Sequence, residues 1–156
     1  MADYIKPVVF KLDDHEYGVD INLVNGIEKY QHIVAVPNSV EYIKGIINLR
    51  GEVVPVYDLR KKFNMPEYTG SGESRSLIVI KIQGIYVALE VDAVSEIHDF
   101  AAEDIVKMPR IVVNNETKFM DRVANVNGRL IILMDINYLL SAQEVEDVKK
   151  LKEDLE

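Results

Sequence analysis

One segment of this chain occurs twice, and the repetition limits the folds that the chain can adopt. Residues 46–63 read as an apolar strand, a two-residue turn, a second apolar strand, an aspartate and a short helix, and residues 124–140 repeat this pattern at an offset of 77 positions. The turn is Arg50-Gly51 in the first copy and Asn127-Gly128 in the second. Asn-Gly is the strongest short hairpin signal, because both residues tolerate positive φ. Arginine is a poor residue for such a turn. The presence of Arg50 therefore indicates a role other than turn geometry.

Two further duplications follow in the same order along the chain. Residues 17–27 resemble residues 86–97 once one residue is inserted, and residues 33–37 resemble residues 105–109 at an offset of 72. A solenoid repeats every 20 to 50 residues or so, which is shorter than these offsets. The collinear order therefore predicts two copies of one small domain.

Composition excludes several classes of protein. A chain of 156 residues supports one domain, or two very small ones that share an interface, and a hydrophobic content of 48% is enough for a packed core. We find no apolar run long enough to span a bilayer and no secretory signal at the N-terminus. The chain has no cysteine, which excludes disulfides and thiolate metal sites, and a net charge of −8 disfavours nucleic acid. We expect a cytoplasmic protein without direct membrane insertion.

The remaining segments predict an all-β chain with short helices. Leu77 to Val91 forms a second strong hairpin around Gln83-Gly84, and Pro55 indicates an edge position or a bulge because proline cannot donate to a strand ladder. Tyr68 to Ser74 is predicted to connect two halves at about residues 13–70 and 75–140, and exchange of strands between the halves stays open. Residues 141–156 predict an acidic C-terminal helix with a capping box at Ser141 and Glu144.

The titratable residues give little support to catalysis. None of the three histidines has a metal-ligand partner at short spacing: His15, His32 and His98. Asp58 and Asp135 are equivalent in the two copies and could suggest a shared-proton pair, but each precedes a short helix that it can cap. Asp20 and Asp92 are predicted to be solvated or turn residues. We therefore predict no catalytic residue, no metal and no cofactor.

The hairpin block carries a resemblance to a known family. Gly45-Ile46-Ile47-Asn48-Leu49-Arg50-Gly51, followed by Pro55-Val56-Tyr57-Asp58-Leu59-Arg60, strongly resembles CheW, the family of bacterial chemotaxis coupling proteins. The likeness continues through residues 17–21, 36–37, 91–94 and 131–135, and it covers roughly residues 5 to 142. A CheW-like domain over this range would be followed by the C-terminal helix.

The resemblance implies both a fold and a function. The fold is two SH3-like five-stranded β-barrels packed on a shared hydrophobic core. The function is that of a non-catalytic adaptor, which binds the regulatory domain of the histidine kinase CheA and the cytoplasmic tip of methyl-accepting chemoreceptors. Such a protein is cytoplasmic and is associated with membrane receptor arrays through protein contacts. Modules of this kind would pair end to end into rings of kinase and coupler.

The resemblance also implies a receptor-binding groove between the barrels. Arg50 and Gly51 match the receptor-contacting pair, and the whole expected set is Val24, Asn25, Ile27, Gly45, Asn48, Arg50, Gly51, Val94 and Ile97. The chain departs from the family at Gly26, where relatives often carry glutamate, and Glu28 is a candidate substitute. For the apolar members, ordinary core packing remains the alternative. Other readings of the chain are a coupler for another signalling pathway, a small-molecule-binding barrel and, third, an enzyme.

Overall fold

The chain folds into two compact units that interleave along the sequence. The computed structural model describes residues 4–36, 41–70, 74–97, 99–108 and 119–155. Unit 1 comprises Met1–Leu23 and Ala93–Leu139, and unit 2 comprises Val24–Asp92 and Leu140–Glu156. These boundaries differ from the consecutive halves at about residues 13–70 and 75–140, because each unit takes strands from both copies of the repeat.

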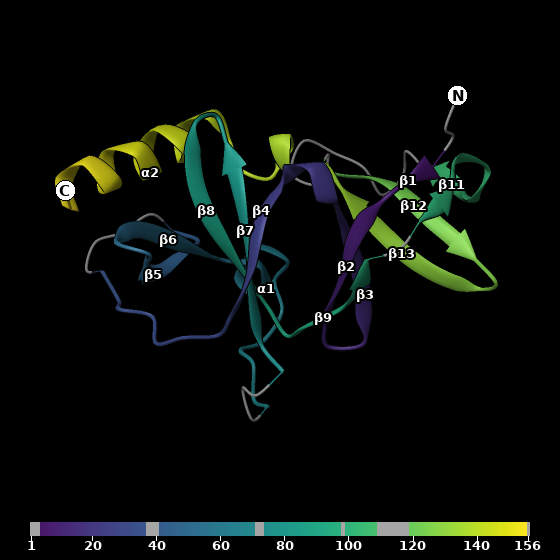
Figure 1. Ribbon diagram of the computed structural model, residues 1–156, viewed down its shortest axis with the longest axis horizontal. Helices are drawn as coiled ribbons and strands as arrows, with labels where there is room; N and C mark the ends of the chain where they lie inside the picture. Colours follow the sequence, from purple (N-terminus) through teal and green to yellow (C-terminus); the bar gives the residue numbers. More distant parts are fainter. Residues whose placement is uncertain (1–3, 37–40, 71–73, 98, 109–118, 156) are drawn as a thin grey trace. The chain divides into compact units, whose positions relative to one another are not determined.

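Unit 1 is built from strands of the N-terminal segment and of the second copy. Its strands are β1 (Tyr4–Ile5), β2 (Pro7–Leu12), β3 (His15–Asp20), β9 (Ala93–Ile97), β10 (Phe100–Ala101), β11 (Ile105–Lys107), β12 (Met120–Val126) and β13 (Arg129–Met134). Within the described residues the main sheet has the order β11-β12-β13-β3-β2-β9, and β1 pairs with β10 (Figure 1). Short 3-10 helices lie at Ile21–Leu23, Ala102–Asp104 and Ile136–Tyr138.

Unit 2 is built from the first copy, completed by a hairpin of the second copy. Its strands are β4 (Val24–Lys29), β5 (Ile43–Leu49), β6 (Glu52–Asp58), β7 (Ser76–Ile82) and β8 (Ile85–Val91). The helices are α1 (Leu59–Lys62) and α2 (Ala142–Leu155). The strand order is β4-β7-β8-β6-β5 (Figure 1). The predicted hairpins at Arg50-Gly51 and Gln83-Gly84 are therefore confirmed.

The two sheets share one topology. β9-β2-β3-β13-β12 in unit 1 corresponds to β4-β7-β8-β6-β5 in unit 2, and in each sheet one pair is parallel, β3 with β13 and β8 with β6. The main sheet of unit 1 has six strands where five were expected, because β11 extends it. The counterpart of β11 in unit 2 is the single bridge Val34↔Ile46, which matches the pair Val106↔Val123 at offsets of 72 and 77. These pairings confirm the repeat.

Each unit encloses apolar side chains from alternating strand positions. The core cluster of unit 2 is Ile47, Val54, Val56, Leu77, Val79 and Ala88. The cluster of unit 1 is Val9, Phe100, Ala124, Ile131 and Leu133. A fully buried side chain of this kind contributes about 1.5–3 kcal/mol through the hydrophobic effect. These clusters hold the hairpins in place.

Pro55 does not lie on an edge strand, so that prediction was wrong. β6 lies between β8 and β5, and the one register shift in the β5–β6 ladder falls between Ile43 and Gly45 rather than at Pro55. The proline is tolerated because the ladder to β8 begins only at Val56, one residue later. On the other side its partner Ile46 directs both its N–H and its C=O to Val34. No ladder bond requires an N–H from Pro55.

The predicted helix caps are confirmed. The Asp58 carboxylate accepts a hydrogen bond from the Lys61 amide at 3.1 Å, and Asp135 accepts one from the Asn137 amide at 3.0 Å. In the capping box of α2, Glu144 accepts from the Ser141 amide and donates its own amide to Ser141 Oγ, both at 3.1 Å. Among the described residues no helix is both long and apolar enough to cross a membrane.

Candidate functional site

The turn between β5 and β6 presents Arg50 to solvent. Arg50 and Gly51 have φ of 53° and 87°, and the Gly51 amide donates to Asn48 Oδ1 at 2.9 Å. The left-handed conformation costs a non-glycine residue roughly 1–2 kcal/mol. The Arg50 side chain is 76% exposed. Asn48 thus stabilises a turn that exposes the Arg50 guanidinium to solvent.

Left-handed turn residues also occur elsewhere in the chain. Asn127 and Gln83 occupy the same turn position with φ of 53° and 47°. Asparagine adopts this left-handed conformation readily, but glutamine, like arginine, does not. Unfavourable turn chemistry is therefore not by itself a sign of binding, and the role of Arg50 depends on its exposure and on its surroundings.

Glu28 holds the Arg50 guanidinium. Arg50 Nη2 lies 3.2 Å from Glu28 Oε2, and the Glu28 side chain is 23% exposed. Glu28 and Gly26 share one face of β4, because alternate strand residues point the same way. A Cβ built on Gly26 would meet only the Glu28 carboxylate, at 3.4 Å. The lack of a side chain at Gly26 therefore leaves room for the Glu28 carboxylate.

The other predicted residues of unit 2 fall into two groups. Val24, Asn25 and Ile27 lie on β4, where Asn25 is exposed and Ile27 is 40% exposed. Gly45 is buried in β5, and a Cβ there would lie 2.7 Å from Ile33 Cγ2 and 2.9 Å from the Val34 carbonyl carbon. Close packing accounts for glycine at position 45, so its contribution to a binding surface is indirect.

Val94 and Ile97 belong to unit 1. Both lie on β9, where Val94 pairs with Phe10 and Ile97 pairs with Val8 of β2. Ile97 is 48% exposed, and it occupies the repeat position that corresponds to Ile27. The structure brings Asn48, Arg50 and Gly51 together in one turn of unit 2. A groove that joins them to Val94 and Ile97 stays a prediction.

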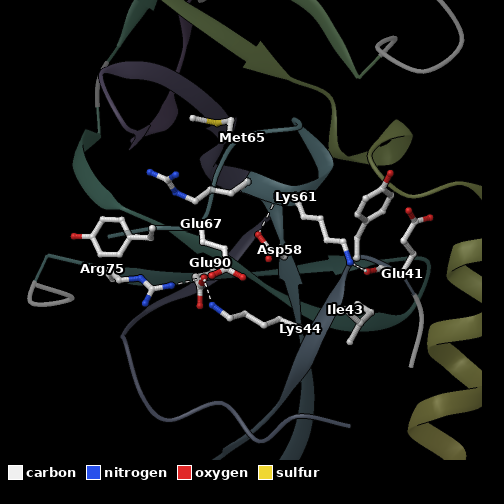
Figure 2. Close-up of a pocket in the computed structure, with 12 residues that line it drawn as sticks. Glu41, Ile43, Lys44, Asp58, Lys61, Met65, Glu67, Arg75 and Glu90 are labelled. Carbon is white, nitrogen blue, oxygen red and sulfur yellow. Dashed lines mark hydrogen bonds and ion pairs between the residues drawn. The ribbon is translucent and has the colours of Figure 1, made fainter. Parts of the chain in front are cut away.

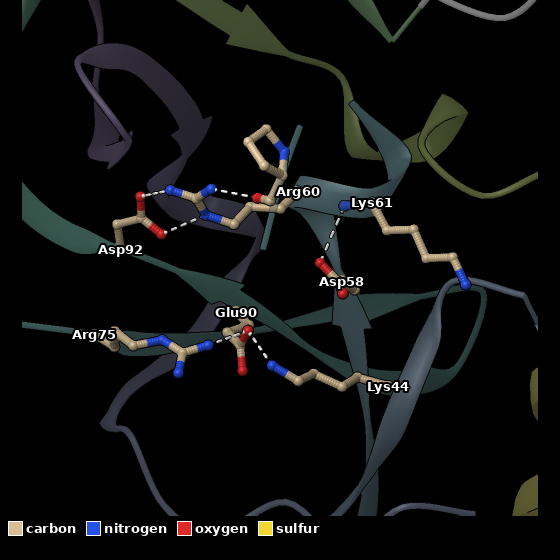
Figure 3. Close-up of polar contacts among 8 residues, drawn as sticks. Lys44, Asp58, Arg60, Lys61, Arg75, Glu90 and Asp92 are labelled. Atoms are coloured by element: carbon tan, nitrogen blue, oxygen red, sulfur yellow. Dashed lines mark hydrogen bonds and ion pairs between the residues drawn. The ribbon is translucent and has the colours of Figure 1, made fainter. Parts of the chain in front are cut away.

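A buried ion pair that the sequence did not predict ties α1 to the end of β8. Arg60 donates from Nε and Nη2 to the two oxygens of Asp92 at 3.0 and 2.7 Å, and from Nη1 to the Pro66 carbonyl at 2.6 Å (Figure 3). Asp92 lies in the bend between β8 and β9, but it is buried, so the solvated alternative of its prediction was wrong. Asp20 does act as a turn residue, since it accepts from the Asn22 amide at 2.9 Å.

A second buried carboxylate lies beside this pair. Glu90 Oε1 accepts from Lys44 Nζ at 2.9 Å and pairs with the Arg75 guanidinium, and Figure 2 shows Glu90 between these two side chains. They line a polar pocket of about 530 Å³ in unit 2. Arg75 also stacks over Tyr30 and Tyr68, at 4.3 and 4.7 Å from the ring centroids. Lys44 and Arg75 therefore already interact with side chains of the chain itself.

The structure also places the metal-ligand residue types and one buried phenol. Among the described residues no cluster of three or more His, Cys, Asp or Glu side chains is placed to hold a metal, and His98 lies outside them. Tyr57 donates to Glu144 at 3.4 Å, and burial, together with that carboxylate, raises the pKa of Tyr57 above its ordinary value. The protonated phenol therefore serves as a donor between β6 and α2.

The structure thus defines a duplicated β-sheet protein with an exposed cationic turn and with buried charges that pair with one another. The family model for the CheW-like domain matches residues 6–144. The chemotaxis protein CheW of Klebsiella aerogenes is 35% identical over 138 residues, which are 88% of this chain and 82% of the relative. That of Bacillus subtilis is 34% identical over 138 residues, 88% of each chain.

A solved structure agrees with these relatives. The crystal structure of the scaffolding protein TtCheW from Thermoanaerobacter tengcongensis superposes with a TM-score of 0.79 at 32% identity, and the match covers 90% of each chain. The chain therefore belongs to the CheW family. This confirms the all-β class with two SH3-like domains.

Proposed function

We propose that this protein couples chemoreceptors to the histidine kinase CheA as a non-catalytic scaffold. The relatives are named chemotaxis proteins, and the similar solved structure is called a scaffolding protein. The observation that carries the proposal is the turn of β5 and β6. There the Arg50 side chain is 76% exposed and pairs with Glu28, at the position that matches the family's receptor contact.

The chemistry of this surface suits a helical partner. The guanidinium presents a planar fork of donors that matches carboxylate and carbonyl oxygens. Ile27 is exposed on β4, the strand that also carries Glu28, and amphipathic helices bind through combinations of apolar and charged contacts. The partner would be the cytoplasmic tip of a methyl-accepting chemoreceptor. The regulatory domain of CheA would bind elsewhere on the protein, which would place it in the cytoplasm at receptor arrays.

Co-sedimentation tests the proposal directly. The purified chain is mixed with CheA and with receptor signalling fragments from the same organism, and each partner is expected to bind at micromolar concentration. Absence of binding to both partners at that concentration would contradict the proposal.

Arg50→Glu is expected to weaken receptor association by about tenfold or more, which corresponds to about 1.4 kcal/mol. The change removes the donor fork and places a second carboxylate beside Glu28. Titration calorimetry with the receptor fragment measures the loss, and CheA binding and the melting temperature should stay near wild type. Asn127→Glu, at the equivalent turn of unit 1, is the matched control. Equal loss of affinity for the receptor fragment and for CheA, or unfolding of the variant, would show that Arg50 has a structural role.

Glu28→Gln is expected to weaken receptor association by a smaller factor, about two- to fivefold, because the guanidinium loses its orienting partner. Stability should change by less than about 0.5 kcal/mol, since exposed ion pairs contribute little. Adding Gly26→Glu to Glu28→Gln returns a carboxylate to the same face of β4 and should restore affinity. Unchanged receptor affinity of Glu28→Gln would show that Glu28 does not belong to the binding site.

A further inference from the structure

The end of the unit 2 barrel beside Arg50 is open. A pocket of about 250 Å³ is lined there by residues of unit 2 only. Its floor is formed by the core residues Val54 and Val79, and its walls by Leu49 and Tyr86, which are half-buried and pack against the same core. Asn25, Arg50 and Glu52 form its rim. The pocket therefore leads from the proposed receptor contact to the edge of the hydrophobic core.

The corresponding end of unit 1 is bridged by ion pairs. Arg129, at the repeat position of Glu52, donates to Glu16 from Nε at 2.8 Å and from Nη2 at 2.6 Å, and it also pairs with Glu96. The bridge thus joins β13 to the adjacent β3 and to β9, which is three places away in the sheet order. The neighbouring Tyr17 ring is buried and stacks on Phe10, with centroids 5.7 Å apart.

Unit 2 cannot build this bridge, because all three positions differ. Glu52 replaces Arg129, Tyr86 replaces Glu16 and Gly26 replaces Glu96. The last equivalence is supported by register, since Gly26 pairs with Val79 just as Glu96 pairs with Val9, which is the repeat counterpart of Val79. With no arginine at 52 and no side chain at 26, unit 2 keeps a pocket at this end, and Val54 and Val79 on its floor are each 1% exposed.

The size and charge of the pocket indicate its occupant. A volume of about 250 Å³ is below the roughly 300–1,000 Å³ of sites for whole small molecules, so one large side chain fits better than a metabolite. The Lys81 and Lys152 ammonium groups lie 5.4 and 6.0 Å from the centroid of the Tyr86 ring, and Arg50 adds a third cation at the rim. These three cations outnumber the two nearby carboxylates, Glu52 at the rim and Glu28 on Arg50, in a chain of net charge −8. The excess of positive charge complements an acidic partner.

We infer that the open end of the unit 2 barrel receives a large apolar side chain from an acidic amphipathic helix, which is the helix that contacts Arg50. The inference rests on the proposed function and adds to it a pocket and the sequence character of the segment that fills it. The helix presents one aliphatic or aromatic residue to Val54 and Val79, with carboxylates near Arg50 and Lys81.

Methyl and amide NMR of the full chain tests the inference during titration with the receptor signalling fragment. We expect the methyl signals of Val54 and Val79 to shift together with the Arg50 and Gly51 amides. Shifts of the two amides with unmoved valine methyls would overturn this inference and leave the proposed function standing. Absence of binding would overturn both. Valine shifts that follow addition of the CheA regulatory domain, and not of the receptor fragment, would assign the pocket to another partner and overturn the inference.

Lys81→Glu supplies an independent measurement with a matched control. Lys81 is exposed on β7, and Lys11 is exposed at the equivalent position of β2 in unit 1. Lys81→Glu is expected to weaken receptor binding about five- to tenfold in calorimetry, since a like charge replaces a complementary one. Lys11→Glu should leave the affinity within about twofold of wild type. Equal affinities of the two variants would overturn the inference.

Discussion

Asp92→Ala is expected to destabilise the protein by about 3–5 kcal/mol, because it leaves the buried Arg60 guanidinium without its counter-charge. Arg60 makes two hydrogen bonds to Asp92, at 3.0 and 2.7 Å, and Asp92 is only 8% exposed. Arg60 also anchors the chain after α1 through the Pro66 carbonyl. Urea unfolding followed by circular dichroism measures the loss as a lower midpoint.

Two further variants show whether the loss comes from the unpaired charge. Asp135→Ala removes only a helix cap and should cost about 1 kcal/mol. Combining Arg60→Met with Asp92→Leu replaces the pair by apolar side chains and should recover much of the stability, since a buried pair contributes little net free energy. A cost for Asp92→Ala no greater than that for Asp135→Ala would contradict this account.

Gly45→Ala is expected to cost about 1–3 kcal/mol through overpacking. The added methyl group would lie 2.7 Å from Ile33 Cγ2 and 2.9 Å from the Val34 carbonyl carbon. Val34 cannot withdraw easily, because it exchanges both of its backbone hydrogen bonds with Ile46, each at 2.9 Å. The same unfolding measurement checks the effect.

Gly26→Ala is the matched control for Gly45→Ala. Gly26 also lies in a strand of unit 2, but the space above it holds only the Glu28 carboxylate, at 3.4 Å. A strand glycine replaced by alanine without a clash gains up to about 1 kcal/mol, so this variant should be as stable as wild type or slightly more so. Equal destabilisation by the two substitutions would mean that strand flexibility, and not packing against Val34, requires glycine at position 45.

The repeat in the sequence predicted much of the fold because its signals are local. The Arg50-Gly51 and Gln83-Gly84 hairpins, the Asp58 cap and the capping box at Ser141 each depend on residues a few positions apart. Turn chemistry and capping operate over such short distances. The edge position predicted from Pro55 was wrong, because the effect of its missing N–H depends on the ladders on both sides of β6.

The candidate site was predictable in part. The family resemblance pointed to Arg50 and Gly51, and the structure places them in an exposed turn with Glu28 as the partner of Arg50. The pair of Arg60 with Asp92 was missed, because the two residues lie 32 positions apart and no local pattern connects them. The open end of the unit 2 barrel was missed for the same reason, since Gly26, Glu52 and Val79 come from three separate strands.

The sequence by itself determined that there are two similar barrels, where their hairpins turn and which residues cap their helices, because hydrogen bonding and side-chain alternation within short segments decide those features. Only the tertiary structure decided that the β2–β3 and β7–β8 hairpins each complete the sheet of the other copy. It also decided that Arg129 bridges one barrel end with Glu16 and Glu96, while Gly26 offers no such partner at the other. Contacts between distant segments depend on which surfaces meet after chain closure, and no local preference specifies that choice.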